Sequence, residues 1–208
     1  MKMNLFNSVV TKKQKRNVFD LTHDVKLTTK MGKLTPICCI EAVPGDSITL
    51  AGDTMIRMAP MTYPILHRIN VTCHYFFVPN RILWSNWEKF ITNEESLAHP
   101  YFNVTAGDSA DMKKFLDYIG IPPVPVSGVG TQVNALPVAA YQCIYNEYYR
   151  DQNLVPEINY KLVDGDNTAN TELFVLRDRA YEHDYFTACL PFAQKGQAVD
   201  IPLGKVVS

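Results

Sequence analysis

The chain has 208 residues, of which 47% are hydrophobic and 20% charged, a composition that allows a folded core and argues against intrinsic disorder. The formal net charge of −1 gives the molecule as a whole no electrostatic bias toward nucleic acid or a membrane. No apolar run approaches the roughly 18 to 20 residues that span a bilayer. The lysines near the N-terminus follow the apolar patch, whereas a secretory signal would place them before it. We therefore expect a cytosolic origin.

Residues 1–33 are expected to form a basic arm, extended and in need of support from another structure. A cluster of cations precedes the first acidic residue, Asp20, and consists of Lys12, Lys13, Lys15 and Arg16. These side chains could neutralise a few phosphates of a nucleic acid in a sequence-independent, salt-sensitive manner. The alternative, equally compatible with the sequence, is a solvated arm without a partner.

Residues from about 34 to 80 are expected to form a series of β-strands. A Pro44-Gly45-Asp46 turn interrupts them, and this turn requires the positive φ that glycine tolerates. The clearest strand follows, because alternate positions from Ile69 to Phe77 are apolar and the positions between them are mostly polar. A period of two over nine residues predicts a half-buried strand.

A change of period after residue 80 predicts helices within a long insertion, about 81–198. Ser85 and Glu88 have capping-box spacing ahead of one short helix. Ser109 or Asp108 caps a second helix that Gly120 ends, with the apolar stripe Met112, Phe115, Leu116 and Ile119. A third helix is expected to begin near Pro137 and to bury one face, formed by Tyr141, Ile144, Tyr145 and Tyr148.

The rest of the insertion is predicted as follows. Residues 151–172 are polar and loop-like, residues 173–190 favour a short helix, and a further strand starts at about 199–208. Strands followed by helices do not make a βαβ pattern, which disfavours a parallel nucleotide-binding sheet.

The five cysteines are expected to be free and mostly buried, because their number is odd and no C-x-x-C spacing occurs. They are Cys38, Cys39, Cys73, Cys143 and Cys189.

The usual catalytic and phosphate-binding motifs are absent from the sequence, so neither catalytic residues nor a cofactor are predicted. Gly128 and Gly130 lack the third glycine of a dinucleotide-binding loop. His67 and His74 have no local partners for a metal site, and we interpret them as polar residues on an exposed sheet face. In Glu182-His183-Asp184 the two carboxylates could shift the protonation of the histidine between them. A loop or inter-subunit ion pair is nevertheless the favoured interpretation.

Several segments, taken in order, resemble the major capsid protein of the Microviridae, small single-stranded DNA phages, and especially its gokushovirus-like branch. They run from about Asn4 to Gly204 and include Asn17-Val18-Phe19-Asp20-Leu21-Thr22-His23-Asp24, Val43-Pro44-Gly45-Asp46, His67-Arg68-Ile69-Asn70-Val71-Thr72, His74-Tyr75-Phe76-Phe77-Val78-Pro79-Asn80-Arg81, His183-Asp184-Tyr185-Phe186-Thr187 and Gln194-Lys195-Gly196.

The resemblance implies a mainly β fold with helical insertions: an antiparallel viral jelly roll, here incomplete, over residues 34–208. It covers only the front portion of the family's longer protein. It also implies a T=1 icosahedral shell of identical copies in the virion, a circular single-stranded DNA genome inside, other virion or scaffold proteins as further partners, no membrane, and no catalytic, cofactor or metal residues.

Within such a shell, large aromatic residues would anchor subunit contacts, and the candidates are Trp84, Trp87, Tyr148 and Tyr149. For the two tryptophans, filling the core of their own subunit is an equal alternative. A different class of function, a β-rich carbohydrate- or ligand-binding module, also remains open because jelly rolls serve as lectins.

Overall fold

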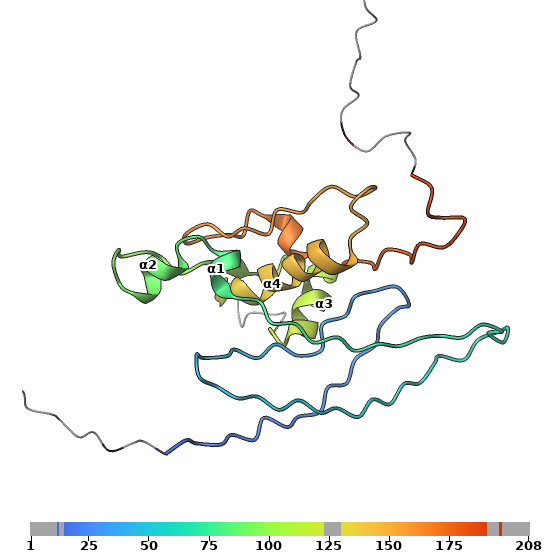
Figure 1. The fold of residues 1–208 in the computed structure, drawn as a ribbon, viewed down its shortest axis with the longest axis horizontal. Coiled ribbons are helices and arrows are strands. Elements are labelled where there is room, and N and C mark those ends of the chain that lie inside the picture. Colours follow the sequence, from blue (N-terminus) through green and yellow to red (C-terminus); the bar gives the residue numbers. More distant parts are fainter. Residues whose placement is uncertain (1–11, 13–14, 123–129, 191–195, 197–208) are drawn as a thin grey trace, which may run out of the picture.

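All helices and strands of the described residues lie between residues 80 and 174 of a computed structural model (Figure 1). The structure describes residue 12 and residues 15–122, 130–190 and 196. Its elements are the helices α1 (Asn80–Leu83), α2 (Trp87–Ile91), α3 (Ala110–Ile119) and α4 (Leu136–Ile144), the strands β1 (Tyr101–Val104) and β2 (Thr131–Asn134), the π-helix η1 (Tyr145–Tyr149) and the 3₁₀ helix η2 (Thr171–Phe174).

Helix α3 begins and ends where the sequence predicts. The Ser109 side chain accepts a hydrogen bond from the backbone N–H of Met112 (3.2 Å), and Gly120 takes the left-handed conformation that ends the helix. Phe115 and Leu116 are fully buried, while Met112 and Ile119 pack at the edge of the core. Local capping and the predicted apolar stripe therefore account for this helix.

Helix α2 forms as predicted, but its predicted capping box is wrong. The N-cap residue is Asn86, not Ser85, and no side chain caps the helix. The Asn86 amide is engaged elsewhere, since it donates to both oxygens of Asp164, at 2.9 and 3.1 Å. The Asn86 side chain thus bonds to the distant Asp164 and does not cap its own helix.

Helix α4 starts one residue before Pro137, whose missing N–H costs nothing in a first turn. Its buried face matches the predicted one only at Tyr145, because Tyr148 is 68% exposed and Tyr141 and Ile144 are only half-buried. The backbone widens to a π-helix at Tyr145–Tyr149, which shifts the rotation of the later residues relative to the α-helical period. The residues buried in α4 are Leu136, Val138, Ala139, Gln142 and Cys143.

A short antiparallel sheet stands within the region that the sequence predicts as helices and loops. β1 pairs with β2 so that Phe102 lies opposite Val133 and Val104 opposite Thr131. Alternation along β1 buries Phe102 and Val104. The prediction of helix and loop alone is wrong here, because strands of four residues are too short to show a period.

The predicted loop at 151–172 also contributes to the core. Ile158, Tyr160 and Leu162 are buried, and the residues between them are exposed. Leu162 donates its N–H to the carbonyl oxygen of Leu83 (2.9 Å) and bridges to Trp84. The period of two in this segment gives it one buried side.

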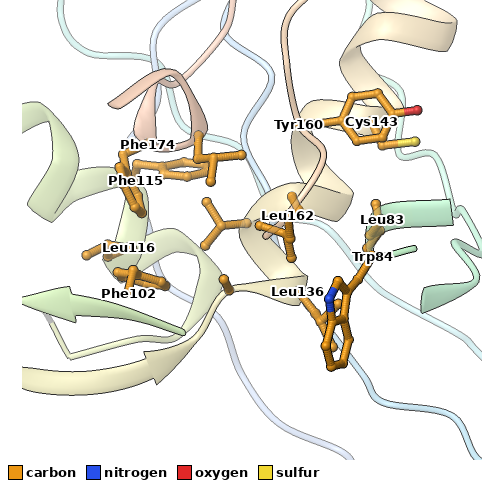
Figure 2. Close-up of a cluster of buried hydrophobic side chains, with 14 of the residues drawn as sticks. Leu83, Trp84, Phe102, Phe115, Leu116, Leu136, Cys143, Tyr160, Leu162 and Phe174 are labelled. Atoms are coloured by element: carbon orange, nitrogen blue, oxygen red, sulfur yellow. The ribbon is translucent and has the colours of Figure 1, made fainter. Parts of the chain in front are cut away.

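The core gathers side chains from α1, β1, α3, α4 and the 158–174 segment. Figure 2 shows Phe102, Phe115, Leu116 and Phe174 together on one side and Leu83, Trp84 and Leu136 on the other, with Leu162 between them. The rings of Phe102 and Phe174 lie 4.9 Å apart. Burial of each such side chain contributes about 1.5–3 kcal/mol.

Residues 34–79 run as extended backbone beside the helical part (Figure 1), and the structure assigns them no strand. The expected inward face of the clearest segment, including Val71, Tyr75 and Phe77, is exposed. A strand needs a hydrogen-bonded neighbour, so the series of strands stays a prediction.

The short helix favoured for residues 173–190 is wrong: η2 ends at Phe174 and the described residues after it are irregular. The strand predicted at about 199–208 and the glycines at 128 and 130 fall partly or wholly outside the described residues; only Gly130 is described, just before β2.

All five cysteines are free, as predicted, but only Cys143 is buried. The prediction of burial is wrong for Cys38, Cys39, Cys73 and Cys189, because they lie in extended segments with little packing in this chain.

The turn at Gly45 adopts the predicted positive φ, +95°. We expect Gly45→Val to lower the free energy of unfolding by about 1–3 kcal/mol, because a β-branched residue is strained at positive φ. No atom lies within 4 Å of the added Cβ, so the effect would come from backbone strain alone. Gly52→Val, in the same extended region without a positive φ, is the matched control. Equal urea midpoints for the two variants would contradict the turn's role.

Candidate assembly surface

The cations of the basic arm lie in water. Lys12, Lys15 and Arg16 are exposed, and the described residues from 15 to 32 are exposed throughout. Lys13 lies outside the described residues. These three charges are accessible to a polyanion. Their exposure is compatible with both predicted alternatives, a nucleic-acid contact and a solvated arm.

The arm joins the folded part through a short backbone ladder. Lys33 forms an isolated antiparallel bridge with Asp178. The N–H of Leu34 donates to the carbonyl of Arg177 (3.0 Å), and that of Arg179 donates to the carbonyl of Gly32 (2.8 Å). The Lys33–Asp178 ion pair (2.8 Å) is largely exposed, so the ladder and not the ion pair provides the stability.

Two tyrosine hydroxyls complete this attachment, which we call the clasp (residues 28–34 held by α3, α4 and residues 177–179). Tyr118 donates to the carbonyl of Thr28. Tyr141 donates to the carbonyl of Leu34 (2.8 Å) and accepts from the N–H of Arg177 (2.9 Å). Burial raises the pKa of Tyr141 to about 12, so this hydroxyl stays a donor at neutral pH.

The clasp rests on the fully buried amide of Gln142. Its Nε2 donates to the carbonyls of Leu173 and Val175, both at 2.9 Å. Its Oε1 accepts from Nε of Arg177 (2.9 Å), and Arg177 also pairs with Glu172 (2.7 Å). A buried amide satisfied in this way fixes the 172–177 segment on α4.

The two tryptophans fill the core of this chain, the alternative that the sequence left open. Trp84 is 0% exposed and donates its indole N–H to Asp164 (2.6 Å). Trp87 is half-buried and packs against Trp84 and Phe90. Trp84 is therefore enclosed within this chain, which supports the core alternative for this residue; its role as an interface anchor stays a prediction.

The two tyrosines of the candidate set lie on the surface, beside a hollow of about 460 Å³. The ring of Tyr149 stacks on His74 at 5.9 Å, and that of Tyr148 lies 4.8 Å from Phe76. His74 also shares a hydrogen bond with the Tyr149 hydroxyl. We call this the aromatic pocket; it is lined by Cys73, His74, Tyr75, Phe76, Tyr148, Tyr149 and Arg179.

The Glu182-His183-Asp184 triplet lies in an exposed turn. Nε2 of His183 lies 3.8 Å from a carboxylate oxygen of Asp151. This contact agrees with a loop ion pair, one of the two interpretations favoured from the sequence. The backbone N–H and the hydroxyl of Thr187 donate to Asp184, and these bonds lower the pKa of that carboxyl. His67 is exposed.

The described residues contain no group of three or more His, Cys, Asp or Glu side chains that could hold a metal ion. Across the same part of the chain, no helix has the length and apolar character needed to cross a membrane.

Sequence reasoning missed the buried Gln142 and the aromatic pocket. The pocket joins residues 73–76, 148–149 and 179, which no local pattern connects. Gln142 lies on the same face of α4 as Val138 and Ala139, so helical spacing could have placed it in the core, although its partners could not have been named.

The described residues thus form a hydrophobic core cluster and a long extended segment whose large apolar side chains are exposed. Comparison with known proteins shows what it is similar to. Residues 7–207 match the family described as Capsid protein (F protein). Capsid protein VP1 of Bdellovibrio phage phiMH2K is 38% identical over 196 residues, covering 91% of this chain and 36% of that protein.

Two further relatives carry the same name. Capsid protein VP1 of Chlamydia phage 1 is 36% identical over 222 residues, covering 95% of this chain and 37% of that protein. Capsid protein VP1 of Spiroplasma virus 4 is 31% identical over 205 residues, covering 91% and 36%. The chain thus spans little more than a third of the length of these relatives.

The chain belongs to the Capsid protein (F protein) family. The resemblance to capsid proteins of the Microviridae is thereby confirmed.

We expect Tyr141→Phe to lower the free energy of unfolding by about 1–3 kcal/mol, because Leu34 and Arg177 each lose a partly buried partner. The native chain should also lose stability as pH rises from about 10 toward 12, since the unfolded state releases the Tyr141 proton first. Urea unfolding at about pH 9 and about pH 11 checks both effects.

In Tyr141→Phe this alkaline loss should be smaller but not zero, because burial also raises the pKa of Tyr160 to about 12. Tyr181→Phe, at an exposed tyrosine, is the control and should behave as the native chain does. An alkaline loss of native size in Tyr141→Phe would show that Tyr141 does not cause it, and an unchanged free energy of unfolding at about pH 9 would show that its hydroxyl does not stabilise the clasp.

Proposed function

We propose that the chain is part of a structural major capsid subunit, copies of which assemble into a small T=1 icosahedral shell around a circular single-stranded DNA genome. The observation that carries this proposal is the family match across residues 7–207, together with three relatives that are each named Capsid protein VP1. The shell would be built in the host cytoplasm and would form the virion.

The surface of the described residues supports a role in assembly. Large apolar side chains are exposed along the extended segment, among them Val18, Phe19, Met55, Leu66 and Phe77. An exposed apolar surface of this length is unusual for a protein that works as an isolated soluble unit, and it marks contacts with other protein surfaces. Such contacts require neither a catalytic residue nor a cofactor.

We further propose that residues of about 34–80 are the first strands of an antiparallel jelly roll. The period of two from Ile69 to Phe77 and the extended backbone in Figure 1 support this fold. The remaining strands would come from sequence that this chain does not contain, which is consistent with its coverage of 36–37% of its relatives. The helical part would then be an insertion beside the sheet.

The basic arm would contact the genome. We expect replacement of Lys12, Lys13, Lys15 and Arg16 with Gln to reduce the DNA content of purified particles without changing subunit stability, because each lost cation removes a phosphate contact. A variant with Arg81→Gln and Lys114→Gln, exposed cations outside the arm, is the control. Native DNA content in the arm variant would contradict this role.

Expression from the complete gene tests the coat function itself. We expect particles of uniform size, separated by sedimentation and seen by electron microscopy, that protect enclosed DNA from nuclease. A product that stays a small soluble unit at every concentration would contradict the proposal. It would favour the carbohydrate- or ligand-binding alternative.

A further inference from the structure

The basic arm is attached to the helical part at one short place. Among the described residues, every hydrogen bond or ion pair between residues 15–34 and the helical part lies at residues 28–34, which we call the strap. Residues 28–32 are exposed, and only Lys33 and Leu34 are half-buried. Figure 1 shows the blue N-terminal segment extending away from the helices. The strap is therefore held mainly by polar contacts, with little apolar burial.

The surface that receives the strap is held in place by bonds of its own. Gln142 and Arg177 fix residues 172–177 on α4 without any contact to the strap. The N–H of Arg177 donates to the Tyr141 hydroxyl (2.9 Å), and that of Ala180 donates to a carbonyl of η1 (3.1 Å). Because these bonds do not depend on the strap, the receiving surface keeps its shape when the strap leaves it.

Release of the strap costs little for the groups that it exposes. The bonds that break join the N–H of Leu34 to Arg177, the N–H of Arg179 to Gly32, and two tyrosine hydroxyls to strap carbonyls. Water can replace each partner at this exposed joint, so each bond contributes only a small net stability. A segment with few apolar contacts and exposed backbone bonds opens far more readily than a buried core.

We propose that the strap is a conformational switch: it leaves α3, α4 and residues 177–179 as one unit while the core stays folded. In the closed state Thr28 is fixed, and the chain from Thr28 to Arg16 reaches at most about 40 Å. In the open state the basic arm moves from an attachment further along the chain and reaches farther from the helical part. This switch is a property of the chain itself and does not rest on the coat function.

Native-state hydrogen exchange, followed residue by residue by NMR in increasing urea, tests the switch. We expect the amides of Leu34 and Arg179, which donate in opposite directions across the joint, to have equal opening constants with little dependence on urea, since little surface is exposed. The amide of Leu116 in α3 should open at least about a hundredfold less often and depend steeply on urea.

Three results of this experiment would overturn the proposal. Leu34 and Arg179 could open only together with Leu116, which would mean that the joint opens with the core. They could open with unequal constants, which would mean that the strap does not leave as a unit. The Arg177 amide, bonded within the helical part, could open as often as that of Arg179, which would mean that the receiving surface leaves too.

A substitution in the strap tests whether its closed shape controls the opening. Gly32 has a φ of +84°, and no atom lies within 4 Å of an added Cβ. We expect Gly32→Ala to raise the opening constants of Leu34 and Arg179 by the same factor, on the order of tenfold, because alanine disfavours left-handed backbone. Gly45→Ala, at a φ of +95° outside the strap and equally free of neighbours, is the matched control and should leave both constants unchanged. Acceleration by both variants, or by neither, would contradict a switch confined to the strap.

A second variant acts from the helical side of the joint. Tyr118 of α3 donates to the carbonyl of Thr28, and we expect Tyr118→Phe to raise the same two opening constants by roughly two- to tenfold, the effect of one net hydrogen bond. Tyr181→Phe, at an exposed tyrosine, is its control. Unchanged constants in Tyr118→Phe would show that α3 does not hold the strap closed. Exchange is read on the chain in solution and needs no shell, so the coat function is judged separately by particle assembly.

Discussion

The described structure depends on one buried amide. Gln142 is fully enclosed, and both its nitrogen and its oxygen have partners: the carbonyls of Leu173 and Val175 and the guanidinium of Arg177. A buried amide left without partners would cost a few kcal/mol, on the order of 1–3. These bonds therefore hold the 172–177 segment in one register on α4. The clasp follows, because the Tyr141 hydroxyl contacts that segment and the arm at once.

The clasp divides the chain into two regions with different physical needs. The helical part buries its own apolar side chains around Phe102, Phe115 and Trp84. The extended part from about residue 15 to 79 exposes most of its large apolar side chains, and apart from the Lys33–Asp178 bridge it has no strand pairing among the described residues. Apolar surface and unpaired backbone both favour association, so a subunit whose contacts lie in a larger assembly accounts for the second region.

Local signals predicted some elements well and others poorly, for identifiable reasons. Both ends of helix α3 were predicted, the start with Ser109 or Asp108 as the cap, because these residues and Gly120 carry clear capping signals. The buried face of α4 was predicted only in part: Tyr145 is buried, but Tyr141 and Ile144 are half-buried because Val138, Ala139 and Gln142 face the core, and the π-helix that follows affects only Tyr148. The strands β1 and β2 were missed because four residues show no usable period, and their pairing joins segments about thirty residues apart in the chain.

The sequence by itself determined the presence of helices α2, α3 and α4, the Gly45 turn, the basic arm and the family, since each depends on residues near one another or on their order along the chain. Only the tertiary structure decided that Trp84 lies in the core, that Gln142 holds the clasp, and that residues from three distant segments form the aromatic pocket. The reason is physical: burial and hydrogen bonding depend on which distant segments meet, and the period of one segment does not contain that information.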